Sequence, residues 1–238
     1  LMYQMGANGW VCVAVEYRLS PGSTFPDHII DCKRALHWIK ENISEYGGNP
    51  EFIAATGGSA GGHLSCLLAL SANAPEFQPG FETADTTVQA CIPFYGVYDF
   101  LNSQGQRSSE SLSQWVSAKV LKKTRAESPE LWHQASPLYW VHKDAPPFLI
   151  IHGEADTLVP VQESRVLYEA LKEASNQAVS YAELPDAQHA FEIAISLRTQ
   201  IVVNHLTLYL NELYRRHLAK DTAKEAISEL PETEQVED

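Results

Sequence analysis

The residues best suited to chemistry form a glycine-rich turn with one serine at its centre. Gly57-Gly58-Ser59-Ala60-Gly61-Gly62 follows a short apolar segment and precedes the apolar run 63–72. This is G-x-S-x-G at a strand-to-helix turn, which exposes a serine hydroxyl on strained backbone and requires small neighbours. The following helix directs its positive end at the serine oxygen, where negative charge would develop. Ser59 is therefore the candidate nucleophile.

Two phosphate-binding motifs and a plain turn are the alternatives for this glycine run. A dinucleotide-binding fingerprint would need a glycine where Ser59 stands, and a P-loop would need a lysine where His63 stands. A tight turn explains the glycines but not the serine at its apex. The nucleophile is the interpretation that accounts for both.

A serine hydroxyl needs a base, and the base needs a carboxylate to orient it. In a sheet of parallel strands, both partners are expected on loops at the carboxyl ends of later strands. Asp156 follows the apolar segment 148–152, and His189 follows the segment 179–184. We therefore predict Asp156 as the acid and His189 as the base.

Other acids and histidines compete for these roles. Glu154 lies close to the end of its strand, and Asp99 follows the strand before it, which is an alternative position for the acid. Most of the other histidines fall within predicted helices or in the long insertion described below. No H-E-x-x-H or similar metal-ligand spacing occurs, so the sequence predicts no metal site.

The elements that must position these residues alternate along the chain. Short apolar segments rich in β-branched residues predict five buried parallel strands, at 11–17, 52–57, 88–95, 148–152 and 179–184. Helical patterns separate them, at 27–43, from residue 60, at 161–174 and at 191–218. Strand alternating with helix predicts an α/β fold, a mostly parallel sheet covered by helices on both faces.

A long insertion interrupts this alternation at residues 99–147. It carries Trp115, Trp132 and Trp140, and a segment of this length between two strands is more often functional than filler. We expect the three rings to form a wall of the substrate pocket; the alternative is that they only pack on the sheet. His152, at the end of the next strand, is a further candidate for the pocket lining, and a packed structural role is the alternative for it.

Composition excludes several classes of protein. The 238 residues carry a net charge of −13, which disfavours binding to nucleic acid or to anionic lipid. No apolar run has the ~20 residues that a membrane-spanning helix needs. The four cysteines lie far apart, which predicts reduced thiols and slightly favours the cytoplasm. We expect one domain over residues 1–218 and a disordered acidic tail over 219–238.

These features resemble the α/β-hydrolase fold, and in particular the hormone-sensitive-lipase-like carboxylesterases. The resemblance covers the chain to about residue 215 and includes Glu16-Tyr17-Arg18-Leu19-Ser20-Pro21, Tyr46-Gly47-Gly48-Asn49-Pro50 and Ser136-Pro137-Leu138. It implies Ser59 as nucleophile, Asp156 as acid and His189 as base. It also implies that the N–H of Ala60 supplies one oxyanion donor and that no cofactor is needed.

The sequence departs from that family in two places. Asp156 is followed by Thr157-Leu158-Val159-Pro160, a form more similar to acetyl-xylan or feruloyl esterases and to prolyl-oligopeptidase-like peptidases. The H-G-G-G motif, which supplies the rest of the oxyanion hole in the family, does not occur in the chain, and the strands that accompany it are missing too. We therefore expect a fragment of a longer polypeptide, or a chain completed by another.

The predicted reaction is hydrolysis of a small carboxylic ester, of short to medium acyl length or an acetyl ester, through an acyl-enzyme. A serine peptidase or amidase with the same triad is one alternative. A non-catalytic binding module on a hydrolase scaffold is another. A homodimer is left open by the sequence.

Overall fold

A computed structural model describes residues 1–228, and its centre is a sheet of four parallel strands. The strands are β1 (Ala54–Gly58), β2 (Ala90–Phe94), β3 (Phe148–Gly153) and β4 (Val179–Leu184), and they lie side by side in chain order. Parallel neighbours need long crossover connections, and helices supply them here. All four carboxyl ends therefore meet at one edge of the sheet.

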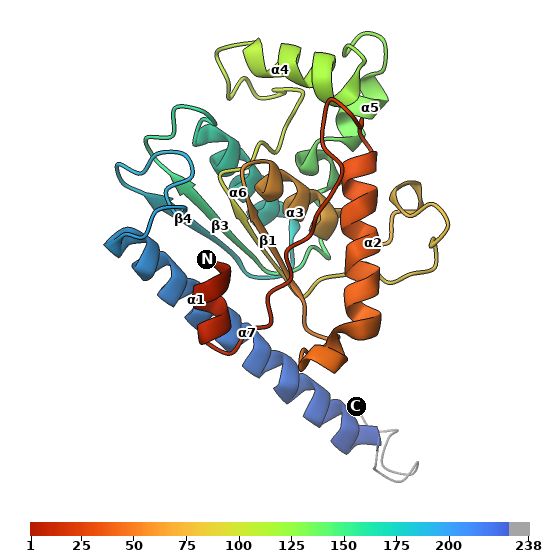
Figure 1. The fold of residues 1–238 in the computed structure, drawn as a ribbon, viewed down its shortest axis with the longest axis vertical. Coiled ribbons are helices and arrows are strands. Elements are labelled where there is room, and N and C mark those ends of the chain that lie inside the picture. The colour runs from red at the N-terminus through yellow and green to blue at the C-terminus, as the bar shows by residue number, and fades with distance from the viewer. Residues whose placement is uncertain (229–238) are drawn as a thin grey trace.

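Helices cover both faces of this sheet (Figure 1). The α-helices are α1 (Met2–Ala7), α2 (Asp27–Asn42), α3 (Ala60–Leu70), α4 (Ser111–Trp115), α5 (Pro129–Gln134), α6 (Gln162–Ala174) and α7 (Leu197–Ser228). The 3-10 helical segments are η1 (Ile43–Tyr46), η2 (Pro75–Phe77) and η4 (Pro137–Trp140), and η3 (Val116–Leu121) is a π-helical segment. One face packs against α2, α3 and α6, and the other against α1 and α7, which contact each other.

The two central strands, β2 and β3, are buried on both faces because their side chains alternate between the two helical layers, whereas the edge strands β1 and β4 are partly exposed. On β2, Cys91 packs in the core on the side of α3, whereas Ile92 and Phe94 pack on the side of α7. β3 alternates in the same way, with Ile150 on the first side and Ile151 on the second. Continuous apolar strands are what this two-sided burial requires, and the predicted α/β class is confirmed.

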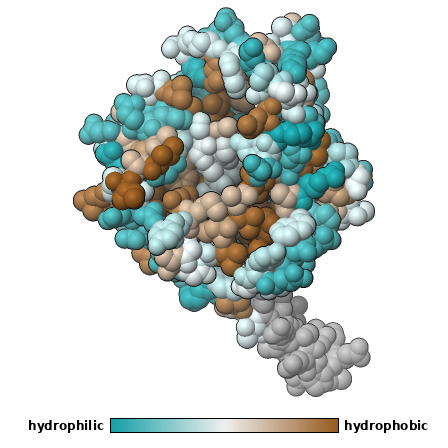
Figure 2. Space-filling model, in the orientation of Figure 1, coloured by the Kyte–Doolittle hydropathy of each residue, from teal (hydrophilic) through white to brown (hydrophobic). Residues whose placement is uncertain are grey.

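Four of the five predicted strands are present, and the one at residues 11–17 is not. That segment forms no strand in the described part of the chain, and Val11 and Val13 are each 44% exposed. It runs past the sheet between α1 and α2 (Figure 1), and apolar side chains gather near the middle of this face (Figure 2). The apolar side-chain pattern is present, but a strand also needs a hydrogen-bonded neighbour, and none of the described strands pairs with this segment.

The last helix differs from its predicted range at both ends. It begins at Leu197 rather than at residue 191, because residues 190–196 form the loop after His189. It continues to Ser228, so residues 219–228 of the predicted disordered tail are helical. Ala, Lys and Glu are frequent in this stretch and have high helix propensity, which explains the extension. Residues 229–238 of the tail lie outside the described residues. None of the described helices is both long and apolar enough to cross a bilayer.

A buried lysine fastens α2 to the loop that follows α3. Lys33 is fully buried, and its ammonium group donates hydrogen bonds to the backbone oxygen of Ser71 and to the side chains of Gln78 and Thr86. Burial disfavours the charged form and lowers the pKa of Lys33 to about 8.

A second buried polar contact anchors the insertion. Arg107 pairs with Glu163 on α6 and also donates to the backbone oxygen of Asp99 at 2.8 Å. Glu163 in turn accepts the N–H groups of Tyr98 and Asp99, at 2.9 and 3.2 Å. The start of the insertion is therefore held close to β2 by a buried ion pair and its backbone hydrogen bonds, although Nε of Arg107 is buried without a hydrogen-bond partner among the described residues. That residues 99–147 act as one cap remains a prediction.

Candidate active site

Ser59 occupies the turn between β1 and α3, at the carboxyl edge of the sheet. Its backbone angles are φ 57° and ψ −116°, which are unfavourable for a residue with a side chain. The Ser59 N–H donates to the backbone oxygen of Phe94 on β2, at 3.0 Å. A Cβ on Gly62 would stand 2.3 Å from that same oxygen, and one on Gly57 would stand 2.6 Å from the backbone of Gly61. The turn can form only because these positions are glycine.

Ala60 is the first residue of α3, directly after the serine. The N–H groups in the first turn of a helix have no acceptor within the helix, and Ala60 is exposed. Its N–H is thus free to bind an anionic oxygen formed beside Ser59, and the role of oxyanion donor remains a prediction.

The structure brings together the three residues predicted from separate parts of the chain. The Nε2 atom of His189 lies 3.0 Å from the Ser59 hydroxyl oxygen. Its Nδ1 atom lies 2.6 Å from Oδ2 of Asp156. The result is a continuous hydrogen-bond chain from carboxylate to imidazole to hydroxyl, in the order that a Ser-His-Asp triad requires.

Asp156 is held as an anion that can orient the histidine. Its Oδ1 atom accepts the N–H groups of Leu158 and Val159 at 2.9 and 2.8 Å, and its side chain is inaccessible to solvent. Burial by itself would raise the pKa of Asp156. Hydrogen bonds from His152, the Val159 N–H, His189 and the Leu158 N–H outweigh it and lower the pKa to about 2. The carboxylate is therefore ionised across the neutral range.

His152 lies behind Asp156 and does not line a pocket, so that prediction is wrong. It is fully buried, with Nε2 3.2 Å from Oδ2 of Asp156 and 3.0 Å from the backbone oxygen of Val159. Two acceptors at Nε2 place the proton there, and Nδ1 then accepts the hydroxyl of Ser164 at 2.6 Å. His152 is thus a second donor to the acid. Its partner Ser164 lies on α6, and no local pattern in the sequence links the two.

The loops that carry the acid and the base are bonded to each other. The N–H of Ala155 donates to the backbone oxygen of Ala187 at 3.0 Å, and the N–H of Glu154 donates to that of Leu184 at 2.9 Å. A Cβ on Gly153 would stand 2.3 Å from the Ala187 oxygen, so glycine is required for this approach. The Asp156–His189 distance is therefore set by backbone contacts as well as by the two side chains.

The alternative acids are placed elsewhere. Oδ2 of Asp99 accepts the N–H and the hydroxyl of Ser103 and the amide of Gln106, and its Oδ1 accepts the N–H of Leu101. Asp99 therefore organises the start of the insertion. Glu154 is exposed to solvent. Neither occupies the place beside His189 that Asp156 fills.

The three tryptophans of the insertion differ in their surroundings. Trp132 is 1% exposed, packs in the core and donates its indole N–H to the backbone oxygen of Lys123, so it cannot form a pocket wall and the prediction is wrong for it. Trp140 packs beside Phe77, with ring centroids 5.4 Å apart. Trp115 is 54% exposed. A pocket role for Trp115 and Trp140 remains a prediction.

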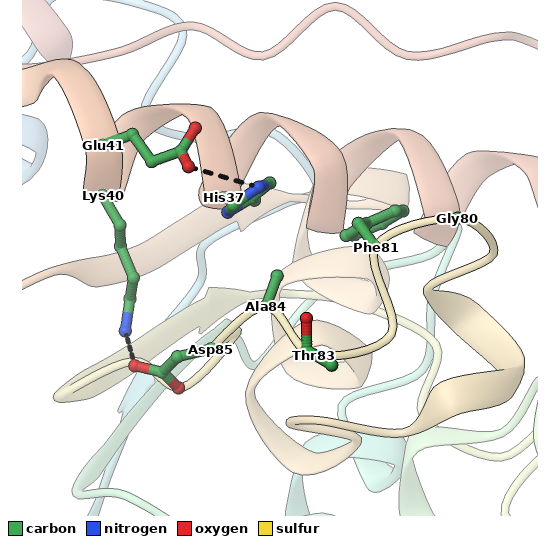
Figure 3. A pocket seen from close by; sticks show the side chains of 8 residues that line it. All are labelled: His37, Lys40, Glu41, Gly80, Phe81, Thr83, Ala84 and Asp85. Carbon is green, nitrogen blue, oxygen red and sulfur yellow. Dashed lines mark hydrogen bonds and ion pairs between the residues drawn. The ribbon is translucent and has the colours of Figure 1, made fainter.

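A surface pocket between α2 and the loop around residue 83 contains none of these residues (Figure 3). Its ionisable side chains are already paired, Lys40 with Asp85 and His37 with Glu41. It therefore offers little to a ligand. Among residues 1–228, no cluster of three or more His, Cys, Asp or Glu side chains is suited to hold a metal ion.

A family model and two curated relatives match most of this chain. The BD-FAE family model matches residues 1–171. The chain is 46% identical to esterase LipQ of Mycobacterium tuberculosis over 231 residues, covering 97% of this chain and 54% of that protein. It is 51% identical to the probable carboxylic ester hydrolase LipM of the same organism over 214 residues, covering 90% and 49%. The chain thus spans about half the length of the curated relatives it matches.

Solved structures share the fold. A truncated carbohydrate esterase from gut microbiota superposes with a TM-score of 0.69 at 23% identity, covering 84% of this chain and 73% of that one. The apo form of Thermogutta terrifontis esterase 2 superposes with a TM-score of 0.65 at 26% identity, covering 83% and 70%. The α/β-hydrolase fold is therefore confirmed.

Proposed function

Because this chain belongs to the BD-FAE family, we propose that it hydrolyses carboxylic esters, with Ser59 as nucleophile, His189 as base and Asp156 as the acid that orients the base. One observation carries the proposal, the unbroken hydrogen-bond chain of 2.6 and 3.0 Å that joins these three side chains. The names of the two Mycobacterium tuberculosis relatives, an esterase and a probable carboxylic ester hydrolase, support the same reaction.

The mechanism follows from the positions of the protons. His189 accepts the Ser59 proton at Nε2 while Asp156 holds the Nδ1 proton and stabilises the imidazolium. The serine oxygen attacks the ester carbonyl, and the Ala60 N–H at the amino end of α3 donates to the oxyanion. Proton transfer from His189 releases the alcohol and leaves an acyl-enzyme. A water molecule, deprotonated by the same histidine, then hydrolyses it.

The substrate class we propose is a small ester of short to medium acyl length, or an acetyl ester. A serine amidase would use the same triad, but the relatives named above are esterases. A binding module without catalysis would have no need of a strained serine aligned with an imidazole and a buried carboxylate. The homodimer stays a prediction.

The test compares the native protein with its Ser59→Ala variant. We expect the native protein to turn over p-nitrophenyl acetate and butyrate, to leave the matching p-nitroanilides nearly intact, and to react covalently with a fluorophosphonate probe. Ser59→Ala should lose both hydrolysis and labelling while keeping its thermal unfolding transition. Labelling that persists in the variant would remove Ser59 from the mechanism, and faster cleavage of anilides than of esters would favour an amidase.

A further inference from the structure

Tyr95 is a buried side chain beside the triad for which the mechanism above has no role. It follows β2, is 2% exposed, and has φ 35°, a strained conformation for a residue with an aromatic side chain. Its N–H donates to the backbone oxygen of Ile151 on β3 at 2.9 Å, which holds its backbone in the sheet. Strain kept in place by the surrounding structure is often found at functional sites.

The Tyr95 ring contacts the loop that carries the base. Its centroid lies 4.5 Å from the centroid of the His189 ring, with the planes inclined by 59°. It also lies 5.8 Å from the ring of Phe191, two residues further along that loop. Its hydroxyl donates to Oε1 of Glu192, the next residue. One side chain therefore contacts three of the four residues from 189 to 192.

The same hydroxyl also borders the nucleophile turn. A Cβ on Gly58, the residue before the serine, would stand 2.5 Å from the Tyr95 hydroxyl oxygen. Tyr95 thus fills the space between the turn that presents Ser59 and the loop that presents His189. A displacement of the Tyr95 ring would therefore disturb both the turn that carries Ser59 and the loop that carries His189.

Packing alone does not explain why a tyrosine, bonded to Glu192, occupies position 95. Phenylalanine would occupy the same volume without burying a phenol. The second oxygen of Glu192, Oε2, is buried and has no hydrogen-bond partner among the described residues. Groups buried in this way cost stability, so a purely structural role explains them poorly. Burial and the nearby Glu192 carboxylate raise the pKa of Tyr95, so the phenol keeps its proton and remains the donor.

Two hydrogen bonds do not by themselves fix an imidazole. Bonds at Nδ1 and Nε2 leave the ring free to tilt about the line that joins its two partners, and tilting misdirects the lone pair that must accept the serine proton. Contact with a ring face removes this freedom, provided that the contacting group is itself held in place.

We propose that Tyr95 and Glu192 are positioning residues for His189, a role that rests on the proposed function. The hydrogen bond between them holds the Tyr95 ring against the imidazole and ties it to the loop on which the histidine stands. Neither residue is required to touch the substrate.

The chain offers a matched control for this role. Tyr181 on β4 is a half-buried tyrosine whose hydroxyl donates to a glutamate, Glu183, at 2.7 Å. Glu183 pairs with Arg165 on α6 rather than with the triad. Tyr181→Phe therefore removes the same chemical group from the same kind of partner at another place in the fold.

The experiment measures kcat and KM of the native protein for p-nitrophenyl butyrate, together with its fluorophosphonate labelling rate, below the unfolding transition. Tyr95→Phe and Glu192→Ala should each lower kcat and the labelling rate about tenfold, with KM changed less than about twofold. The double variant should be no slower than the slower single variant, because both changes break one bond. Glu192→Gln keeps an acceptor oxygen and should retain most of kcat. Tyr181→Phe should leave kcat unchanged.

Several outcomes would overturn the assignment. If Tyr95→Phe does not fold, Glu192→Ala and Glu192→Gln decide the question by their difference in kcat. A positioning role would be refuted by any of three results. Glu192→Ala and Glu192→Gln could have equal kcat, the substitutions could raise KM and leave kcat unchanged, or Tyr181→Phe could lose as much kcat as Tyr95→Phe. Wild-type protein that neither hydrolyses esters nor reacts with the probe would instead refute the proposed function itself.

Discussion

Replacing Asp156 by asparagine tests whether the carboxylate sets the tautomer of His189. Oδ1 of Asp156 accepts two backbone N–H groups at 2.8 and 2.9 Å. An asparagine must keep its carbonyl oxygen there, because its amide group cannot accept those bonds. The amide NH₂ is then forced into the place of Oδ2, which now lies 2.6 Å from Nδ1 of His189.

The expected loss follows from this geometry. An NH₂ group facing Nδ1 makes that nitrogen an acceptor, so the ring proton moves to Nε2, where it meets the Ser59 hydroxyl and blocks proton transfer. A tautomer reversed in this way costs ~10⁴ in kcat, or about 5 kcal/mol of transition-state stabilisation. The same NH₂ opposes the Nε2 proton of His152, 3.2 Å from Oδ2, so His152 must also change its tautomer.

The assay is kcat for p-nitrophenyl butyrate at neutral pH, together with the rate of fluorophosphonate labelling and a thermal unfolding curve. Asp99→Asn is the control, because the Asp99 carboxylate bonds to residues of the insertion. We expect it to change kcat less than tenfold. A variant Asp156→Asn that keeps more than a tenth of wild-type kcat, or a larger loss in Asp99→Asn, would refute the assignment of the acid.

Two further predictions concern stability. Gly62→Ala should lower the free energy of unfolding by ~1–3 kcal/mol, because its Cβ would stand 2.3 Å from the backbone oxygen of Phe94. Gly61→Ala is the control, because a Cβ there would have nothing within 4 Å, and it should leave the free energy of unfolding unchanged or raise it. Equal urea midpoints for the Gly62→Ala and Gly61→Ala variants would contradict the reasoning. Burial lowers the pKa of Lys33 from 10.5 to about 8, so between these values the unfolded chain binds more protons than the folded one. Stability relative to Lys33→Met should therefore rise with pH across this window, by at most ~3 kcal/mol, and a flat difference would show that Lys33 titrates normally.

The local sequence was enough to identify the nucleophile turn and most of the sheet. The requirement for glycine at positions 57 and 62 arises from backbone atoms a few residues away or on the next strand, so the motif carries its own geometry. The strands β2 and β3 are apolar on both faces and could be recognised from composition alone, whereas β4 is more mixed and carries Ser180 and Glu183. The acid and the base could then be placed, because the carboxyl ends of parallel strands share one edge.

What the sequence could not provide are contacts between residues far apart in the chain. His152 was predicted as a pocket residue, and only the packing of α6 and the loop after β3 shows it bonded to Ser164 and Asp156. The hydrogen bond between Tyr95 and Glu192 joins residues 97 positions apart, and no periodic pattern in the sequence indicates it. The prediction of a strand at residues 11–17 was wrong for a related reason. Its side-chain pattern is local, but strand formation depends on a hydrogen-bonded neighbour, which only the tertiary arrangement can supply.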